Sequence, residues 1–113
     1  MKTLKYILPS FLVLILVLNI NAQSSALKTE TFNVPGNCGM CKSRIEKAAK
    51  VSGVTKAQWN EKSHILTLVY NPQKIKSDDV QKRIAAVGHD TPKFKADAKT
   101  YNSLPGCCKY ERK

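Results

Sequence analysis

Two cysteines, Cys38 and Cys41, stand three positions apart in the segment Cys-Gly-Met-Cys, directly ahead of a helical pattern. This spacing holds two sulfur atoms where one soft metal ion or one disulfide bond can join them. A thiolate is a preferred ligand of soft ions such as Cu(I) and of Zn(II), and it is also the nucleophile in thiol exchange. The pair is therefore compatible with metal binding and with redox chemistry.

The position of the pair at the expected start of a helix favours the charged form of both sulfurs. The helix N-terminus and the nearby cations Lys42 and Arg44 lower the pKa of a thiol. We therefore expect Cys38 and Cys41 to lose their protons near neutral pH and to coordinate metal. Two thiolates suffice for Cu(I), whereas Zn(II) generally takes four ligands, so Cu(I) is the first choice and Zn(II) an alternative.

The N-terminal segment has the features of a secretory signal peptide. Lys2 and Lys5 precede an apolar run over residues 7–18, and Ala22 is a small residue suited to cleavage. A signal peptide over residues 1–22, followed by a linker over 23–27, predicts an exported protein that is periplasmic or secreted. The run is short for a membrane span, and no later stretch approaches the roughly 20 apolar residues that a span needs.

Two further cysteines, Cys107 and Cys108, are neighbours near the end of the chain. Adjacent cysteines bridge each other only with strain. They are candidates for extra ligands to the first pair, for a second weak site, or for a flexible end without a shared role. We favour extra ligands, because soft thiolates rarely stay exposed and idle in an oxidising compartment.

The order of the expected elements points to one small domain. It consists of a strand over 28–34, a helix from Cys41 to the Ser52-Gly53 stop, strands over 54–60 and 65–70 that form a hairpin, a helix from Ser77 to Gly88, and a weak edge strand over 93–98. This is the split βαβ order of an α+β, ferredoxin-like βαββαβ sandwich. Such a fold has a four-stranded antiparallel sheet with two helices on one face.

These motifs resemble the heavy-metal-associated domain family. The resemblance covers residues 28–98 and rests on four features: Gly36-Asn37-Cys38-Gly39-Met40-Cys41 after a strand, a first helix, a hairpin ending Val69-Tyr70-Asn71-Pro72, and a second helix ending Ala86-Val87-Gly88. Residues 99–113 remain as a cysteine-containing C-terminal tail.

The resemblance implies both the cargo and the kind of partner. The family includes small copper chaperones, N-terminal modules of copper- and zinc-transporting P-type ATPases, and a periplasmic mercury-binding protein. It therefore implies that Cys38 and Cys41 are the metal-binding thiolates, that Hg(II) is a further alternative ion, and that the partner is a metal-transporting membrane protein or another metal acceptor.

The sequence departs from the family pattern at two places. The family usually carries a methionine two residues before the first cysteine, where this chain has Gly36, and here Met40 lies between the cysteines instead. The bacterial copper members tend to have a tyrosine directly after the glycine that ends the second helix, where this chain has His89. An imidazole there can act as a third ligand or, when protonated, offset thiolate charge. His89 therefore joins Cys107 and Cys108 as a candidate further ligand.

The chain is strongly basic, with a formal net charge of +11 at pH 7. This balance favours acidic partners or anionic surfaces, so we expect an acidic docking surface on the acceptor and note that peripheral membrane contact is compatible with the charge. Nucleic acid is a poor candidate, because aromatic residues are few and are not interleaved with a basic stripe. We expect a monomer.

Two alternatives to a metal carrier remain. A thiol-disulfide oxidoreductase also carries Cys-x-x-Cys at a helix start. Such enzymes place the pair in a larger sheet with a cis-proline loop near the cysteines, whereas this chain is short and has no proline suitably placed after the hairpin. We therefore expect that the protein is not an enzyme. The other alternative is a small disulfide-stapled binding domain, because a bridge from the first pair to the tail would close about 70 residues and contribute about 4 kcal/mol.

Overall fold

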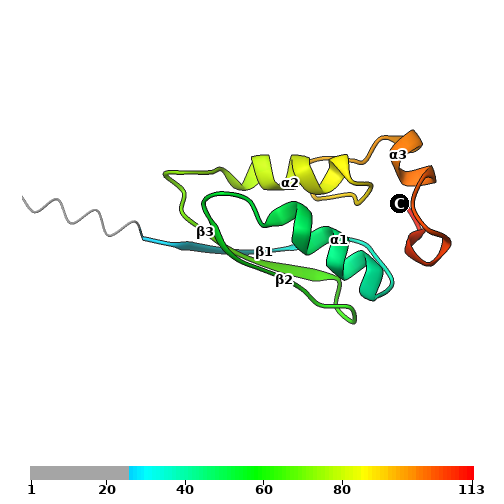
Figure 1. The fold of residues 1–113 in the computed structure, drawn as a ribbon, viewed down its shortest axis with the longest axis horizontal. Helices are drawn as coiled ribbons and strands as arrows, with labels where there is room; N and C mark the ends of the chain where they lie inside the picture. The colour runs from blue at the N-terminus through cyan, green and yellow to red at the C-terminus, as the bar shows by residue number, and fades with distance from the viewer. Residues whose placement is uncertain (1–25) are drawn as a thin grey trace, which may run out of the picture.

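The computed structural model describes residues 26–113, so the expected signal peptide and most of the expected linker lie outside the described residues. The elements are β1 (Lys28–Asn33), α1 (Gly39–Ala49), β2 (Val54–Trp59), β3 (Ile65–Tyr70), α2 (Ser77–Ala86), α3 (Ala98–Asn102) and a 3-10 turn, η1 (Gly106–Cys108). Figure 1 shows α1 and α2 on the same face of the sheet. Within residues 26–113, no helix is both long enough and apolar enough to cross a membrane.

The sheet is antiparallel, with β3 between β1 and β2. In its register, Leu66 of β3 lies opposite Phe32 on one side and Trp59 on the other. Successive side chains of a strand point to opposite faces, so the buried residues Leu66, Leu68 and Tyr70 define the inner face of β3. The sequence alone did not reveal this face, because residues 65–70 are apolar nearly throughout.

The helices close the core over that inner face. Ile45 of α1 and Ile84 of α2 are fully buried, and both belong to one cluster with Leu66 and Leu68. Complete burial of such a side chain contributes about 1.5–3 kcal/mol. The predicted first helix, hairpin and second helix are therefore present.

The predicted fourth strand over 93–98 is wrong, because its amides are bound by nearby groups. The N–H of Lys93 donates to Gln81 Oε1 at 3.1 Å, and the N–H of Ala96 donates to Asp90 Oδ1 at 2.8 Å. Pro92 has no N–H to give to a ladder. In residues 26–113, the sheet thus has three strands and β1 pairs only with β3.

The C-terminal tail folds back onto the domain. Leu104 is buried against Gly88, where an added Cβ would lie 2.8 Å from Leu104 Cδ2. Gly88 has φ +109, a left-handed conformation that favours glycine, so the residue both ends α2 and receives the tail. The Tyr110 hydroxyl donates to the Gly88 carbonyl oxygen at 2.8 Å.

An ion pair holds the end of the tail as well. Arg112 donates to both carboxylate oxygens of Asp90, at 3.0 and 2.7 Å, and its guanidinium stacks over the ring of Tyr101. Leu104, Cys108 and Tyr110 share the core with the strands and helices. Figure 1 shows the result, with α3 and the C-terminal turn at the end of the molecule where α1 begins.

Candidate metal centre

The first pair of cysteines sits at the start of α1. Cys38 is the N-cap residue, with extended backbone angles (φ −142°), and Cys41 lies in the first turn. The helix begins at Gly39, two residues earlier than the sequence pattern predicts. As a result the Cys41 sulfur is carried inward and is fully buried, whereas Cys38 is only half-buried.

The metal-binding loop packs on an aromatic ring. An added Cβ on Gly36 would lie 2.9 Å from Trp59 Cζ2 and 3.1 Å from Cys41 Cβ, so no side chain fits at that position. Trp59 is itself fully buried, and its Nε1–H donates to the Val34 carbonyl oxygen at 2.9 Å. The indole thus fills the space under the loop. This explains why glycine stands where the family usually has methionine.

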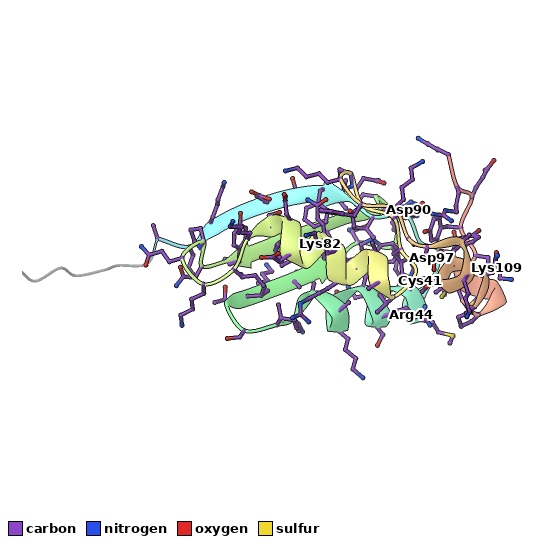
Figure 2. All side chains as sticks on the ribbon, turned by 90° about the horizontal axis from the view of Figure 1, so that it is seen from above. Cys41, Arg44, Lys82, Asp90, Asp97 and Lys109 are labelled. Carbon is purple, nitrogen blue, oxygen red and sulfur yellow. The ribbon has the colours of Figure 1, made fainter. Side chains whose placement is uncertain are left out.

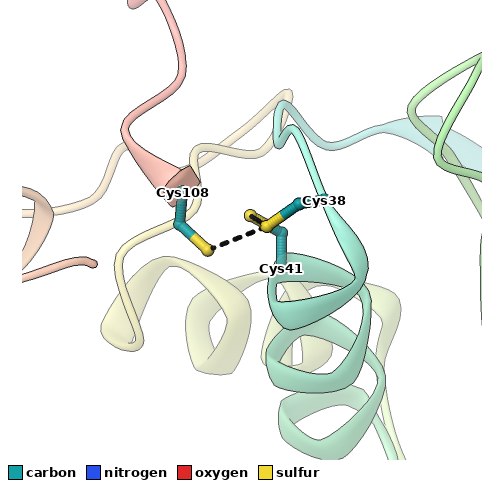
Figure 3. Close-up of side chains that lie close together, drawn as sticks. All are labelled: Cys38, Cys41 and Cys108. Carbon is teal, nitrogen blue, oxygen red and sulfur yellow. Dashed lines mark hydrogen bonds between the residues drawn. The ribbon is translucent and has the colours of Figure 1, made fainter. Parts of the chain in front are cut away.

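Cys108 brings a third sulfur to this pair from the other end of the chain. Its Sγ lies 3.7 Å from Cys38 Sγ, and Cys38 Sγ lies 3.7 Å from Cys41 Sγ. All three sulfurs lie within 4.8 Å of one another, and Figure 3 shows them converging from α1 and η1. We refer to Cys38, Cys41 and Cys108 as the inner sulfur group.

Cys107 lies outside the inner sulfur group but touches it. Its Sγ is 3.4 Å from Cys38 Sγ and 3.9 Å from Cys108 Sγ, and its side chain is exposed. The structure therefore brings Cys107 and Cys108 to the Cys38 and Cys41 pair, rather than leaving them as a separate site or a detached end. All four residues are free thiols in the structure.

One cation contacts the inner sulfur group directly. Arg44 Nη1 donates to Cys108 Sγ at 3.2 Å. Lys42, the other cation expected to act on the thiols, instead donates to the Trp59 carbonyl oxygen at 2.7 Å and pairs with Glu46 at 3.0 Å. Of the two expected cations, Arg44 is thus the one that compensates sulfur charge, and it does so at Cys108.

The inner cysteines differ in acidity. The backbone N–H of Cys41, at the helix start, lowers the pKa of Cys38 to about 7. Burial raises the pKa of Cys41 to about 11 and also raises the pKa of Cys108. The prediction that both sulfurs of the first pair lose their protons near neutral pH holds for Cys38 and is wrong for Cys41, because desolvation outweighs the helix N-terminus there.

His89 is fully buried beneath the loop. It does not belong to the group of ligand atoms within 4.8 Å of one another, which consists of the sulfurs of Cys38, Cys41 and Cys108. Its Nδ1 lies 2.9 Å from the Pro35 carbonyl oxygen, and its ring stacks on Tyr110 with centroids 5.4 Å apart. Burial lowers the pKa of His89. The imidazole therefore connects the loop to the tail as a neutral group, and its Nε2 has no hydrogen-bond partner among the described residues.

The sequence did not indicate the structural roles of three residues of the site. Trp59 supports the loop, Arg44 reaches Cys108, and Met40 places its thioether 3.6 Å from Cys107 Sγ. A sequence signal existed for Trp59, since it is the one tryptophan of the chain and the glycine at position 36 leaves space for it. No such signal existed for the contacts with the tail.

The arrangement suits a soft, sulfur-loving ion. Several thiols converge at one end of the domain, most of them shielded from solvent, with one acidic thiol and one adjacent guanidinium. Figure 2 shows Cys41, Arg44 and Lys109 together at this end. Thiolates select ions such as Cu(I), Zn(II) and Hg(II) over hard cations.

Comparison with known proteins agrees with this chemistry. The structure is similar to the CopZ metallochaperone, with a TM-score of 0.55 and 32% sequence identity over 57% of this chain and 98% of CopZ. It is also similar to the Cu(I)-loaded N-terminal domain of a potential copper-translocating P-type ATPase from Bacillus subtilis, with a TM-score of 0.55 and 28% identity over 57% of this chain and 84% of that one.

A comparison of sequences shows that the chain is similar to a zinc-transporting ATPase from Synechocystis sp. (strain ATCC 27184 / PCC 6803 / Kazusa), with 38% identity over 69 residues. The match spans 59% of this chain but 10% of the ATPase. No protein-family model matches the chain. Because a metallochaperone at 32% identity is covered almost completely, and because the cysteine loop and element order agree, the chain belongs to the heavy-metal-associated domain family.

Proposed function

We propose that this protein is an exported Cu(I) carrier. It binds the ion on Cys38 and Cys41, with Cys108 as a third sulfur ligand, and either passes it to an acceptor by thiolate exchange or sequesters it. The observation that carries the proposal is the convergence of these three sulfurs within 4.8 Å of one another. The proposal assigns the protein no catalytic role.

The spacing of the sulfurs supports a preformed site. Three sulfurs bound about 2.3 Å from a zinc-sized ion in a trigonal plane would lie about 4 Å apart. The two distances from Cys38 Sγ are 3.7 Å each, so an ion can bind with only small movements of the side chains. Preorganisation of this kind favours affinity, because little conformational entropy remains to be lost.

The number of sulfurs favours Cu(I) over the alternatives. Cu(I) accepts two or three sulfur ligands, whereas structural Zn(II) generally takes four in a tetrahedron. Cys107 is not within the inner sulfur group, so a fourth ligand requires rearrangement of an exposed side chain. Hg(II) also fits soft sulfur ligands, and we treat Zn(II) as the competitor in the test below.

The proposal also includes export of the protein and a partner protein that accepts the metal ion. The apolar run ahead of Ala22 supports export to the periplasm or beyond, and the family supports a metal-transporting membrane protein as the acceptor. The basic balance of the chain supports an acidic docking surface on that acceptor. A monomer is sufficient for this function.

Competition with a Cu(I) chelator in an anaerobic, reducing buffer tests the proposal. Replacing both first-pair cysteines (Cys38→Ser with Cys41→Ser) removes the two central ligands, so the affinity for Cu(I) should fall by at least about a hundredfold. Cys38→Ser alone is the safer variant, because the Cys38 side chain is only half-buried. Circular dichroism verifies that each variant is folded.

X-ray absorption of the loaded protein counts the ligands. Three sulfurs are expected in the parent and two in Cys108→Ser, which keeps the first pair. Unchanged Cu(I) affinity in the double variant would refute the site. Displacement of Cu(I) by an equimolar amount of Zn(II) would instead refute the choice of metal.

A further inference from the structure

A second set of sulfur atoms lies on the outside of the metal centre. Cys107 Sγ lies 3.4 Å from Cys38 Sγ and 3.6 Å from the thioether sulfur of Met40. We call Cys38, Cys107 and Met40 the outer sulfur group. It shares Cys38 with the inner sulfur group, so the two groups meet at a single sulfur atom.

The outer sulfur group is open to solvent where the inner one is closed. Met40 is 54% exposed and is one of two large hydrophobic side chains exposed in residues 26–113. Cys107 is exposed, and an added Cβ on its neighbour Gly106 would meet nothing within 4 Å. In contrast, Cys41 and Cys108 are fully buried. An ion arriving from solvent therefore meets the outer sulfurs first.

A methionine thioether is suited to a transient Cu(I) ligand. It carries no proton, so it can bind without first ionising, and it is soft enough to prefer Cu(I) over Zn(II). A single exposed apolar side chain is ordinary on a protein surface, so exposure alone assigns Met40 no role. The evidence is instead the contact of its thioether with the exposed Cys107 thiol, which places two soft ligands side by side.

We infer that the outer sulfur group is the entry and exit position for Cu(I), from which the ion passes to the inner sulfur group through Cys38. The inference rests on the proposed function and deepens it by assigning the route of the ion. It makes Met40 a ligand during transfer and not in the resting complex.

The transfer balances without any change in oxidation state. On entry, the bonds between Cu(I) and the ligands of its donor break, bonds to the sulfurs of Cys38, Cys107 and Met40 form, and the thiol protons still present on the two cysteines leave to solvent. On moving inward, the bonds to Met40 and Cys107 break and bonds to Cys41 and Cys108 form. Cys107 takes up one proton, and Cys41 and Cys108 each release one. Copper remains Cu(I), and exit reverses these steps.

The rate of copper uptake tests the route. The protein is mixed anaerobically with Cu(I) bicinchoninate in a stopped-flow instrument, and the loss of the coloured complex is followed. Met40→Leu keeps the volume of the side chain but removes its sulfur, so uptake should slow by about tenfold. The equilibrium affinity should change by less than about twofold. Ser43→Ala is the matched control, since Ser43 is exposed on α1 close to Met40, and its rate should equal that of the parent.

Selenium labelling detects the outer bond directly. The chain contains two methionines, Met1 and Met40, so a selenomethionine-labelled protein reports on Met40 with one background site. Cys41→Ser weakens the inner sulfur group, and one equivalent of Cu(I) should then give copper–selenium scattering at the selenium edge. The same label in a protein that also carries Met40→Leu should give none.

The outcomes separate this inference from the proposed function. A parent that fails to bind Cu(I) through Cys38 and Cys41 overturns both. A parent that binds Cu(I), with an uptake rate unchanged by Met40→Leu, overturns the route alone. An affinity loss in Met40→Leu as large as its loss of rate also overturns the route, because Met40 would then belong to the resting complex.

Discussion

The four cysteines are chemically alike in the sequence, but the structure makes each sulfur different. Cys38 has a pKa of about 7 because it lies beside the Cys41 amide at the start of α1, whereas burial keeps Cys41 and Cys108 protonated. The hydrogen bond with Cys38 raises the pKa of Cys107. The centre thus carries little negative charge until a metal ion displaces the remaining protons, which avoids repulsion among buried thiolates.

Selective alkylation tests this order of acidity. A thiolate is the reactive form of cysteine, so Cys38 should react with iodoacetamide at pH 7 before Cys107, although Cys107 is the more exposed. Because the pKa of Cys38 is lowered, its rate should rise with pH through a midpoint of about 7. Peptide mass spectrometry after brief labelling of the reduced apo-protein identifies the modified residue. Faster labelling of Cys107 would contradict the assignment.

The helices and strands whose formation depends on local interactions could be predicted from local sequence patterns. The first helix, the hairpin and the second helix follow from apolar periodicity and from Gly53 and Gly88, both of which have positive φ. The strand over 93–98 failed because the side chains of Gln81 and Asp90 bind its amides. Those side chains lie 12 and 6 residues before the amides they bind, and no strand pattern reveals such a competition.

The tail was predictable only in part, because its role depends on contacts across the whole domain. The resemblance to a family ends near residue 98, and residues 99–113 have no regular apolar period. Their docking depends on Leu104 meeting the bare backbone of Gly88 and on Tyr110 reaching the same residue. The thiol chemistry of Cys107 and Cys108 could be predicted from the sequence, but their position beside Cys38 could not.

Truncating Leu104 should loosen the tail. Leu104→Ala removes a buried side chain that packs on Gly88, so the free energy of unfolding should fall by about 2–4 kcal/mol. Urea unfolding of the apo-protein in excess reductant measures this change in the free energy of unfolding. Glu111→Ala, an exposed change in the same segment, should stay within about 0.5 kcal/mol of the parent.

The same measurement tests the alternative of a disulfide-stapled domain. Packing of Leu104 and Tyr110 holds the tail in the thiol form, so the parent should be nearly as stable with reductant as without it. A bridge from Cys38 to the tail would instead make reductant alone cost about 4 kcal/mol. If reductant lowers the free energy of unfolding by this amount and Leu104→Ala leaves it unchanged, the disulfide-stapled domain is the better explanation.

The sulfur centre lies at one end of the domain, and exposed lysines are found both there and along the rest of the domain. Lys109 is exposed directly beside Cys108, and Figure 2 shows it at the same end as Cys41 and Arg44. Lys82 is also exposed but lies along α2, away from that end. Charge near a docking surface raises association rates more than it raises affinity, and salt screens the effect.

Charge reversal at these two lysines should therefore separate local attraction from net charge. Lys109→Glu and Lys82→Glu change the total charge equally, but only Lys109 adjoins the sulfur centre. With an anionic Cu(I) chelator such as bathocuproine disulfonate as the acceptor, Lys109→Glu should slow transfer by about three- to tenfold at low salt, and Lys82→Glu by less than twofold or so. The difference should shrink above about 0.3 M salt, where the Debye length falls to a few ångströms. Equal slowing by the two variants, or a difference that salt leaves intact, would show that the positive charge beside Cys108 does not guide the approach of acidic acceptors.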